Sequence, residues 1–184
     1  MHYTLCDLIA DLTQNSAEAK AKKITVELLE TDKDLTVYIR DDGKGMSQEV
    51  LQKAANPFYT DGIKHPKRKI GMGIPFLIQT ASDTGGFWDI QSKEGEGTTV
   101  TARFDLTNID TPPIGDVPLL FRQILTFPGG CEMQIIRKKN TKTSEFEYDF
   151  LRSDLIDALG GLETAGDQAL LLDFLQSQED QSGD

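Results

Sequence analysis

The sequence lacks the features that mark several large classes of protein. None of its apolar runs approaches the roughly 20 residues that a membrane-spanning helix needs. Its N-terminus does not show the basic and then apolar pattern of a signal peptide. The two cysteines, Cys6 and Cys131, lie far apart, which fits neither a disulfide framework nor a metal-binding spacing. We therefore expect a reduced, cytoplasmic setting and no membrane partner.

Positive charge is also scarce. The sequence has 19 Lys and Arg residues against 30 Asp and Glu residues, so its net charge is −11. Nucleic acids and anionic membranes attract proteins through clustered cations, so this balance excludes nonspecific binding to either. Residues 64–69 are the local exception, because Lys64, Lys67, Arg68 and Lys69 follow one another closely. A phosphate-bearing ligand would explain such a basic segment, and so would a solvated loop.

The hydrophobic pattern up to about residue 106 predicts a mixture of helices and strands. Apolar residues at helical spacing, with Thr4 and Ser47 as caps, predict helices over 4–21, 47–55 and 71–82. Alternating apolar and polar residues predict strands at 24–28, 35–39, 87–91 and 98–104. Strands come in adjacent pairs, and helices precede each of these pairs along the chain. We therefore expect an α+β two-layer sandwich with helices on one face of a sheet.

A break at Thr111–Pro113 separates this part from a second segment, and we expect a domain over 1–109 and an extension over 110–184. The pattern of the extension predicts four elements and a fraying end: a helix at 117–125, a hairpin of 132–137 and 145–150 across 139–143, a helix from Ser153 as cap to Gly160, a helix at 165–176, and fraying over 178–184.

The apolar stripes of the extension admit two interpretations. They are formed by Leu119, Leu120, Ile124, Leu125, Leu170, Leu171, Phe174 and Leu175. In the first interpretation they are a core extension that covers one side of the sandwich. In the second they form a surface for homodimerisation or for docking a partner.

One polar pair and three glycine motifs stand out. Asp11 and Asn15 are four residues apart and share one helix face, where they could orient water and bind a hard cation such as Mg²⁺. Asp41 ends a strand before spaced glycines that let backbone approach a ligand. Gly71–Gly73 opens a helix, whose N-terminus suits phosphate. Taken singly, a solvated helix face, a tight turn or an ordinary helix start explains each motif, and Gly95–Thr99 alone is a hairpin turn.

Taken together, the motifs resemble in order and spacing the GHKL superfamily of histidine kinases, anti-sigma-factor kinases, type II topoisomerases, Hsp90 and MutL-type proteins. The resemblance covers residues 4–106. The matching boxes are the asparagine box at 11–19, the first glycine box at 41–46, the phenylalanine box at 56–60, the second glycine box at 71–76 and the third at 95–100.

This resemblance implies a Bergerat ATP-binding fold with a mixed, mostly antiparallel sheet, and ATP and Mg²⁺ as cofactors. It implies that Asn15 ligates Mg²⁺, that Asp41 takes the adenine amino group, and that Thr98 helps through a water. Gly43 and Gly45 would pass beneath the base, Gly71 and Gly73 would lie against the phosphates, and residues 56–69 would form a lid. The remaining expected nucleotide contacts are Met46, Tyr59, Thr60, Lys67, Lys69, Met72 and Ile74.

One departure from the family pattern concerns catalysis. Members that hydrolyse ATP carry a glutamate where this chain has Asp11, and that carboxylate acts as general base. Asp11 is one methylene shorter. We therefore expect ATP binding, and a catalytic role for Asp11 that depends on closer backbone or a second water.

The chain offers no helical hairpin with a phospho-accepting histidine, because its histidines are His2 and His65. It therefore resembles stand-alone modules of the anti-sigma-factor kinase type more than sensor kinases. We expect a cytoplasmic signal-transduction protein that transfers the γ-phosphoryl group of ATP to an unidentified partner protein. The alternative is a nucleotide-gated binding or scaffold protein with little or no turnover.

Overall fold

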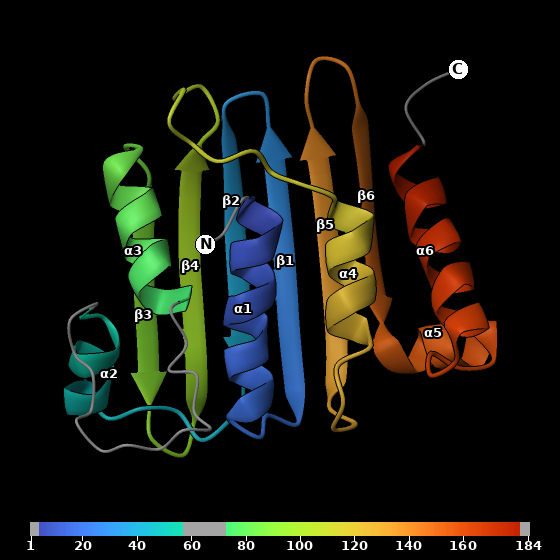
Figure 1. The fold of residues 1–184 in the computed structure, drawn as a ribbon, viewed down its shortest axis with the longest axis horizontal. Helices are drawn as coiled ribbons and strands as arrows, with labels where there is room; N and C mark the ends of the chain where they lie inside the picture. Colours follow the sequence, from blue (N-terminus) through green and yellow to red (C-terminus); the bar gives the residue numbers. More distant parts are fainter. Residues whose placement is uncertain (1–3, 57–72, 181–184) are drawn as a thin grey trace.

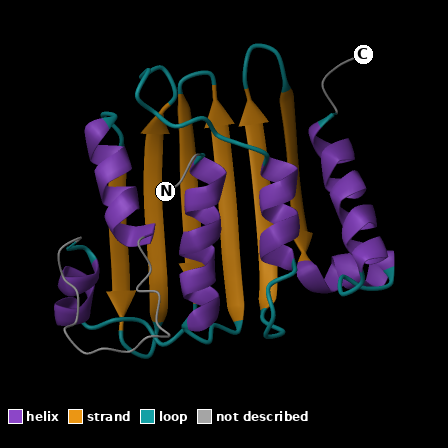
Figure 2. Cartoon of the chain, viewed as in Figure 1, coloured by secondary structure: helices purple, strands orange, loops and turns teal. Residues whose placement is uncertain are grey.

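A six-stranded sheet carries helices on one face within residues 4–56 and 73–180, which are the residues that the computed structural model describes. Figures 1 and 2 show the helical layer in front of the strands. The strands are β1 (Lys23–Thr31), β2 (Asp34–Asp41), β3 (Phe87–Lys93), β4 (Gly97–Asp105), β5 (Glu132–Asn140) and β6 (Glu145–Leu151). The helices are α1 (Leu5–Glu18), α2 (Gln48–Ala54), α3 (Gly73–Asp83), α4 (Val117–Leu125), α5 (Arg152–Leu159) and α6 (Ala165–Glu179). The predicted α+β two-layer sandwich is confirmed.

The strands are arranged in the order β3-β4-β2-β1-β5-β6. β1 and β5 are parallel, and the other neighbouring pairs are antiparallel, so the expected mixed, mostly antiparallel sheet is confirmed. Alternate residues of β1 point toward the helices, and Ile24, Val26 and Leu28 are fully buried there. A period-2 pattern with one apolar face is what a sheet covered on one side requires.

The start of α1 is set by a capping box. The Thr4 hydroxyl accepts the Asp7 N–H over 3.1 Å, and the Asp7 carboxylate accepts the Thr4 N–H over 3.0 Å. These two bonds satisfy donors that a helix start leaves open. From this cap, α1 runs across the sheet with Leu5, Leu8 and Ile9 buried beneath it, and its C-terminal turn reaches the edge where β2 ends.

The segment after residue 110 enlarges both layers of the sandwich. β5 pairs with β1 along its whole length, and α4 packs beside α1 (Figure 1). Phe121, Ile124, Leu171 and Leu175 are fully buried in the hydrophobic core that also contains the residues of β1 and α1. These contacts favour the core-extension interpretation of the apolar stripes. The boundary between residues 109 and 110 stays a prediction, although the sheet and the core continue across it.

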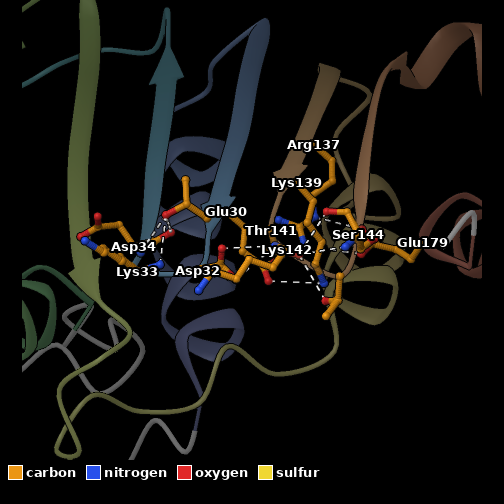
Figure 3. A network of polar contacts seen from close by, with 12 residues as sticks. Glu30, Asp32, Lys33, Asp34, Arg137, Lys139, Thr141, Lys142, Ser144 and Glu179 are labelled. Carbon is orange, nitrogen blue, oxygen red and sulfur yellow. Dashed lines mark hydrogen bonds and ion pairs between the residues drawn. The ribbon is translucent and has the colours of Figure 1, made fainter. Parts of the chain in front are cut away.

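A buried ion-pair network connects β1, β5 and the end of α6 (Figure 3). Arg137 is 1% exposed, its Nε donates to Glu179 over 3.0 Å, and its Nη2 pairs with Glu30. The Tyr148 hydroxyl also donates to Glu179, over 2.8 Å. The expectation that fraying begins at Gln178 is wrong, because this network holds the last turn of α6 in place through Glu179; residues 181–184 lie outside the described part.

Two further expectations for the extension need correction. Ser153 is not the cap of α5, because α5 begins at Arg152 directly after β6, and the Ser153 N–H donates to the Glu132 carboxylate over 3.2 Å. The hairpin turn begins later than Lys139. Pairing with β1 keeps β5 extended to Asn140, so the turn starts at residue 141.

Candidate functional site

A hollow of about 350 Å³ lies where α1 ends, β2 ends and β4 begins. In Figure 1 this is the end of the sheet near α2. The described residues that line it come from α1 and its C-cap, from β2 and the segment that follows it, and from α2, α3 and β4: Leu12, Asn15, Ser16, Glu18, Ala19, Asp41, Lys44, Gly45, Met46, Ala54, Ile74, Thr98 and Val100. Of the predicted site residues, the structure brings together Asn15, Asp41, Gly45, Met46, Ile74 and Thr98.

Asp41 is the last residue of β2, and its carboxylate is held from two sides. Ser16 Oγ donates to Oδ2 over 2.5 Å, and the Gly43 N–H donates to Oδ1 over 2.9 Å. Ser16 is a buried residue of α1. Each carboxylate oxygen has more than one lone-pair site, so the two bonds orient Asp41 and leave acceptor capacity for a ligand.

The neighbouring acid Asp42 has a different role. Its Oδ1 accepts the N–H groups of Lys22 and Lys23 over 2.7 and 2.9 Å. The hydrogen bond from the Lys23 N–H is the largest cause that lowers the pKa of Asp42 below its usual value. Asp42 therefore stabilises the turn between α1 and β1, whereas Asp41 lines the hollow.

The glycines after β2 are required by a close approach of two backbone segments. Gly45 has a φ of +61°, and a Cβ on it would lie 1.9 Å from the Lys93 carbonyl oxygen. A Cβ on Gly97 would lie 2.0 Å from the Asp41 carbonyl oxygen. The turn between β3 and β4 thus presses against the segment that follows β2. Gly43 lies against Ala19 instead and does not line the hollow.

Asn15 lies in the last turns of α1, beside the start of α3. A Cβ on Gly73 would lie 3.6 Å from Asn15 Nδ2 and 3.3 Å from Leu12 Cδ2. Gly73 is thus packed against α1 although it does not itself line the hollow. The amide of Asn15 and the beginning of a helix, where N–H groups suit anions, are therefore adjacent.

Asp11 stands one turn before Asn15 on an exposed position of α1, and it is not part of the lining of the hollow. Its assignment as general base stays a prediction. The predicted lid beyond Asn56 falls outside the described ranges. So do several predicted site residues: Tyr59, Thr60, Lys67, Lys69, Gly71 and Met72.

Two serines that matter to the hollow were not among the predicted site residues. Ser16 lies within the asparagine box at 11–19 but had no role assigned there, yet it donates a hydrogen bond to Asp41, which is 25 residues away. Ser92 Oγ accepts the Met46 N–H over 2.8 Å and lies 2.8 Å from Thr98 Oγ1. The available signal was the register of the β3–β4 hairpin, which places Ser92 opposite Thr98.

The hollow combines an apolar part with two kinds of polar group. Met46, Ile74 and Val100 offer apolar contact, and Asp41 offers an acceptor for an amino group. Asn15 and the start of α3 offer groups suited to a polar or anionic tail. A flat base with an amino group and a phosphate chain fits this arrangement. Over residues 4–56 and 73–180 no group of three or more His, Cys, Asp or Glu side chains could hold a metal ion.

Comparison with known proteins assigns residues 3–108 to the family described as "Histidine kinase-, DNA gyrase B-, and HSP90-like ATPase". The chain is 24% identical over 110 residues to a putative NtrY-like sensor histidine kinase of Rickettsia conorii, covering 60% of this chain and 18% of that protein. It is 27% identical over 148 residues to the CAI-1 autoinducer sensor kinase/phosphatase CqsS of Vibrio cholerae, covering 80% of this chain and 21% of that protein. A solved structure, the catalytic domain of histidine kinase ThkA, is 22% identical with a TM-score of 0.39, covering 52% of this chain and 61% of that one.

The chain thus spans about a fifth of the length of these curated relatives. In the described part of the chain, no helix has the length and apolar character needed to cross a membrane.

Proposed function

The chain belongs to the histidine kinase-, DNA gyrase B- and HSP90-like ATPase family, and from that membership we propose that it binds ATP with Mg²⁺ in the hollow and transfers the γ-phosphoryl group to a partner protein. The observation that supports the nucleotide most directly is the Asp41 carboxylate, which Ser16 and the Gly43 N–H orient within a partly apolar hollow. We place this reaction in the cytoplasm, as part of signal transduction.

In this proposal some residues of the hollow contact the base, and others contact Mg²⁺ and the phosphates. Asp41 accepts the adenine amino group, Thr98 supports it, and Met46 and Ile74 contact the flat base. Asn15 ligates Mg²⁺, and the start of α3 near Gly73 receives phosphate oxygens. Bound Mg²⁺ supplies charge neutralisation at the phosphates, and the protein supplies position, which is most of what phosphoryl transfer requires.

Asp11 is the candidate general base, because it lies one turn from Asn15 on the same helix face. The basic segment with Lys67 and Lys69, and the residues Tyr59, Thr60, Gly71 and Met72, complete the proposed nucleotide contacts outside the described ranges. The acceptor of the phosphoryl group is a side chain of a partner protein, in keeping with the kinases among the relatives.

A second candidate function is a nucleotide-gated binding protein with little turnover. The observation that favours it is the exposed position of Asp11, which does not line the hollow. A base that stays outside the hollow would leave ATP bound but not hydrolysed. Nucleotide binding would then act by ordering a surface for the partner.

Calorimetric titration with ATP and a non-hydrolysable analogue, each with and without Mg²⁺, tests the proposal. We expect Mg²⁺-dependent binding that falls by about tenfold or more in Asn15→Ala, because the metal loses its protein ligand. Asn140→Ala, at the exposed end of β5, is the matched control and should bind as the wild type does. Absence of binding to wild-type protein would overturn the nucleotide site.

Phosphate release and transfer of labelled γ-phosphate separate the two functions. Turnover that drops in Asp11→Asn, but not in the exposed control Asp173→Asn, supports the kinase or ATPase. Binding without turnover, both alone and with candidate partner proteins, supports the nucleotide-gated alternative.

A further inference from the structure

Three side chains from three neighbouring strands form a row at one end of the hollow. Asp41 of β2 lies opposite Thr98 of β4, and Thr98 lies opposite Ser92 of β3. Directly opposed residues of antiparallel strands project to the same face of the sheet. That face is the one covered by helices, since Asp41 bonds to Ser16 of α1. Asp41 and Thr98 line the hollow, and Ser92 stands behind Thr98.

Ser92 Oγ makes three polar contacts. It accepts the Met46 N–H over 2.8 Å, and it lies 2.8 Å from Thr98 Oγ1 and 3.2 Å from the Gly97 carbonyl oxygen. A hydroxyl has one hydrogen and two acceptor sites. The carbonyl of Gly97 can only accept, so all three contacts are hydrogen bonds only when Ser92 donates to Gly97 and the hydroxyl of Thr98 donates to Ser92.

This proton arrangement decides what Thr98 offers to a ligand. When its hydrogen points to Ser92, Thr98 Oγ1 presents only lone pairs to the hollow. The ionised Asp41 carboxylate also only accepts. The Asp41 carboxylate and Thr98 Oγ1 then offer only acceptors at this end of the hollow, which favours a ligand amino group there and leaves an oxo group in the same place without a donor.

We propose that Ser92 is a positioning residue that sets the base specificity of the nucleotide site. By holding the hydroxyl hydrogen of Thr98, it makes the site select the amino group of adenine over the oxo group of hypoxanthine. Ser92 does not touch the nucleotide and acts through Thr98 and Met46. This inference rests on the proposed function, because it presupposes that the base lies beside Asp41.

The test compares non-hydrolysable analogues of ATP and ITP, titrated with Mg²⁺ into wild type, Ser92→Ala, Ser92→Thr and Ser153→Ala. Wild type should bind the ATP analogue with an affinity about tenfold higher or more, because a site that hydrogen-bonds a group of its ligand rejects analogues that lack this group. Ser92→Ala should weaken both analogues, because the Met46 N–H loses its acceptor. It should also narrow the preference by about threefold to tenfold, because Thr98 regains a hydrogen to donate.

Rescue and control variants separate this effect from a loss of structure. Ser92→Thr keeps the hydroxyl and should restore the preference, and Ser153→Ala, on the exposed side of α5, should match wild type. Should Ser92→Ala fail to fold, Thr98→Val gives the second measurement, since it removes the acceptor itself and should also narrow the preference.

The inference is wrong if Ser92→Ala weakens both analogues by the same factor, because Ser92 would then be structural only. It is also wrong if wild type binds both analogues equally. Those two results leave the proposed ATP binding intact. Failure of wild type to bind either analogue overturns the proposed function and this inference together.

Discussion

Ser16 and Asp41 are joined by a hydrogen bond of 2.5 Å that spans 25 positions of the chain and ties α1 to the end of β2. Ser16 is buried, which limits the access of water to its hydroxyl group. The carboxylate that we assign to adenine recognition is thus oriented before any ligand arrives. Such preorganisation improves affinity by reducing what must be ordered on binding.

Ser16→Ala should therefore lower the affinity for ATP by about threefold to tenfold, because one hydrogen bond that orients Asp41 is lost. The fold should persist, since alanine suits a helix. Calorimetric titration measures the change, and Ser82→Ala on the exposed side of α3 is the control. Unchanged affinity in Ser16→Ala would mean that the Gly43 N–H alone orients the carboxylate.

Asp42 gives a prediction about pH. Its pKa is lowered, first of all by the hydrogen bond from the Lys23 N–H, so its carboxylate binds protons less readily in the folded chain. Its contribution to stability is therefore present above the usual Asp pKa and is lost as the pH falls through the lowered value. The side chain is exposed, which keeps this contribution small.

Asp42→Ala should lower the free energy of unfolding by about 1 kcal/mol near pH 7, because two backbone N–H groups lose their acceptor. The difference from wild type should shrink below about pH 4, where the carboxyl group of the unfolded chain is protonated. Urea unfolding at several pH values measures both quantities. Asp110→Ala, at an exposed position, is the control, and a difference that persists at low pH would contradict the argument.

Most helices and strands could be predicted from the sequence because their signals are local. The Thr4–Asp7 capping box and the alternation of Ile24, Val26 and Leu28 depend on neighbours a few residues apart. Pairings between distant segments carry no comparable signal. Nothing in the pattern of residues 132–140 indicates that this strand pairs in parallel with β1, or that Arg137 meets Glu179 at the end of α6.

The candidate site also combines residues that local motifs predict with residues that only long-range contacts reveal. Asn15, Asp41 and Thr98 belong to motifs with fixed spacing, and the structure brings them to one hollow. Ser16 and Ser92 act through contacts that exist only after the strands and α1 are assembled. Their roles follow from the register of the sheet, which the motifs alone do not state.

Glu179 should matter to stability and not to nucleotide binding. Removing it leaves Arg137, which is 1% exposed, with one carboxylate partner fewer. Glu179→Ala should lower the free energy of unfolding by about 2–4 kcal/mol, as expected when one partner of a buried ion pair is removed. Glu163→Ala, exposed before α6, is the control, and urea unfolding gives the measurement.

The affinity for ATP should stay unchanged in Glu179→Ala under conditions where the variant is folded. Glu30, the other partner of Arg137, lies near the end of β1 that is away from the hollow. The nine residues of β1 span roughly 25–30 Å at about 3.3 Å per residue. A fall in ATP affinity would instead show that the network and the hollow are coupled through β1 or α1.

Deletion of residues 112–184 tests whether the extension is a separate unit or part of the core. β5 is hydrogen-bonded to β1 from Lys23↔Glu132 to Thr31↔Asn140, so the deletion would turn a central strand into an edge strand, which invites aggregation. It would also uncover the flank of α1 that α4 now covers. We expect the truncated chain to aggregate or to lose cooperative unfolding, as measured by light scattering and thermal denaturation. A soluble, monomeric 1–111 fragment that binds ATP like the full chain would contradict this and support a separate domain over residues 1–109, because the core would then be complete without Phe121, Ile124 and Leu171.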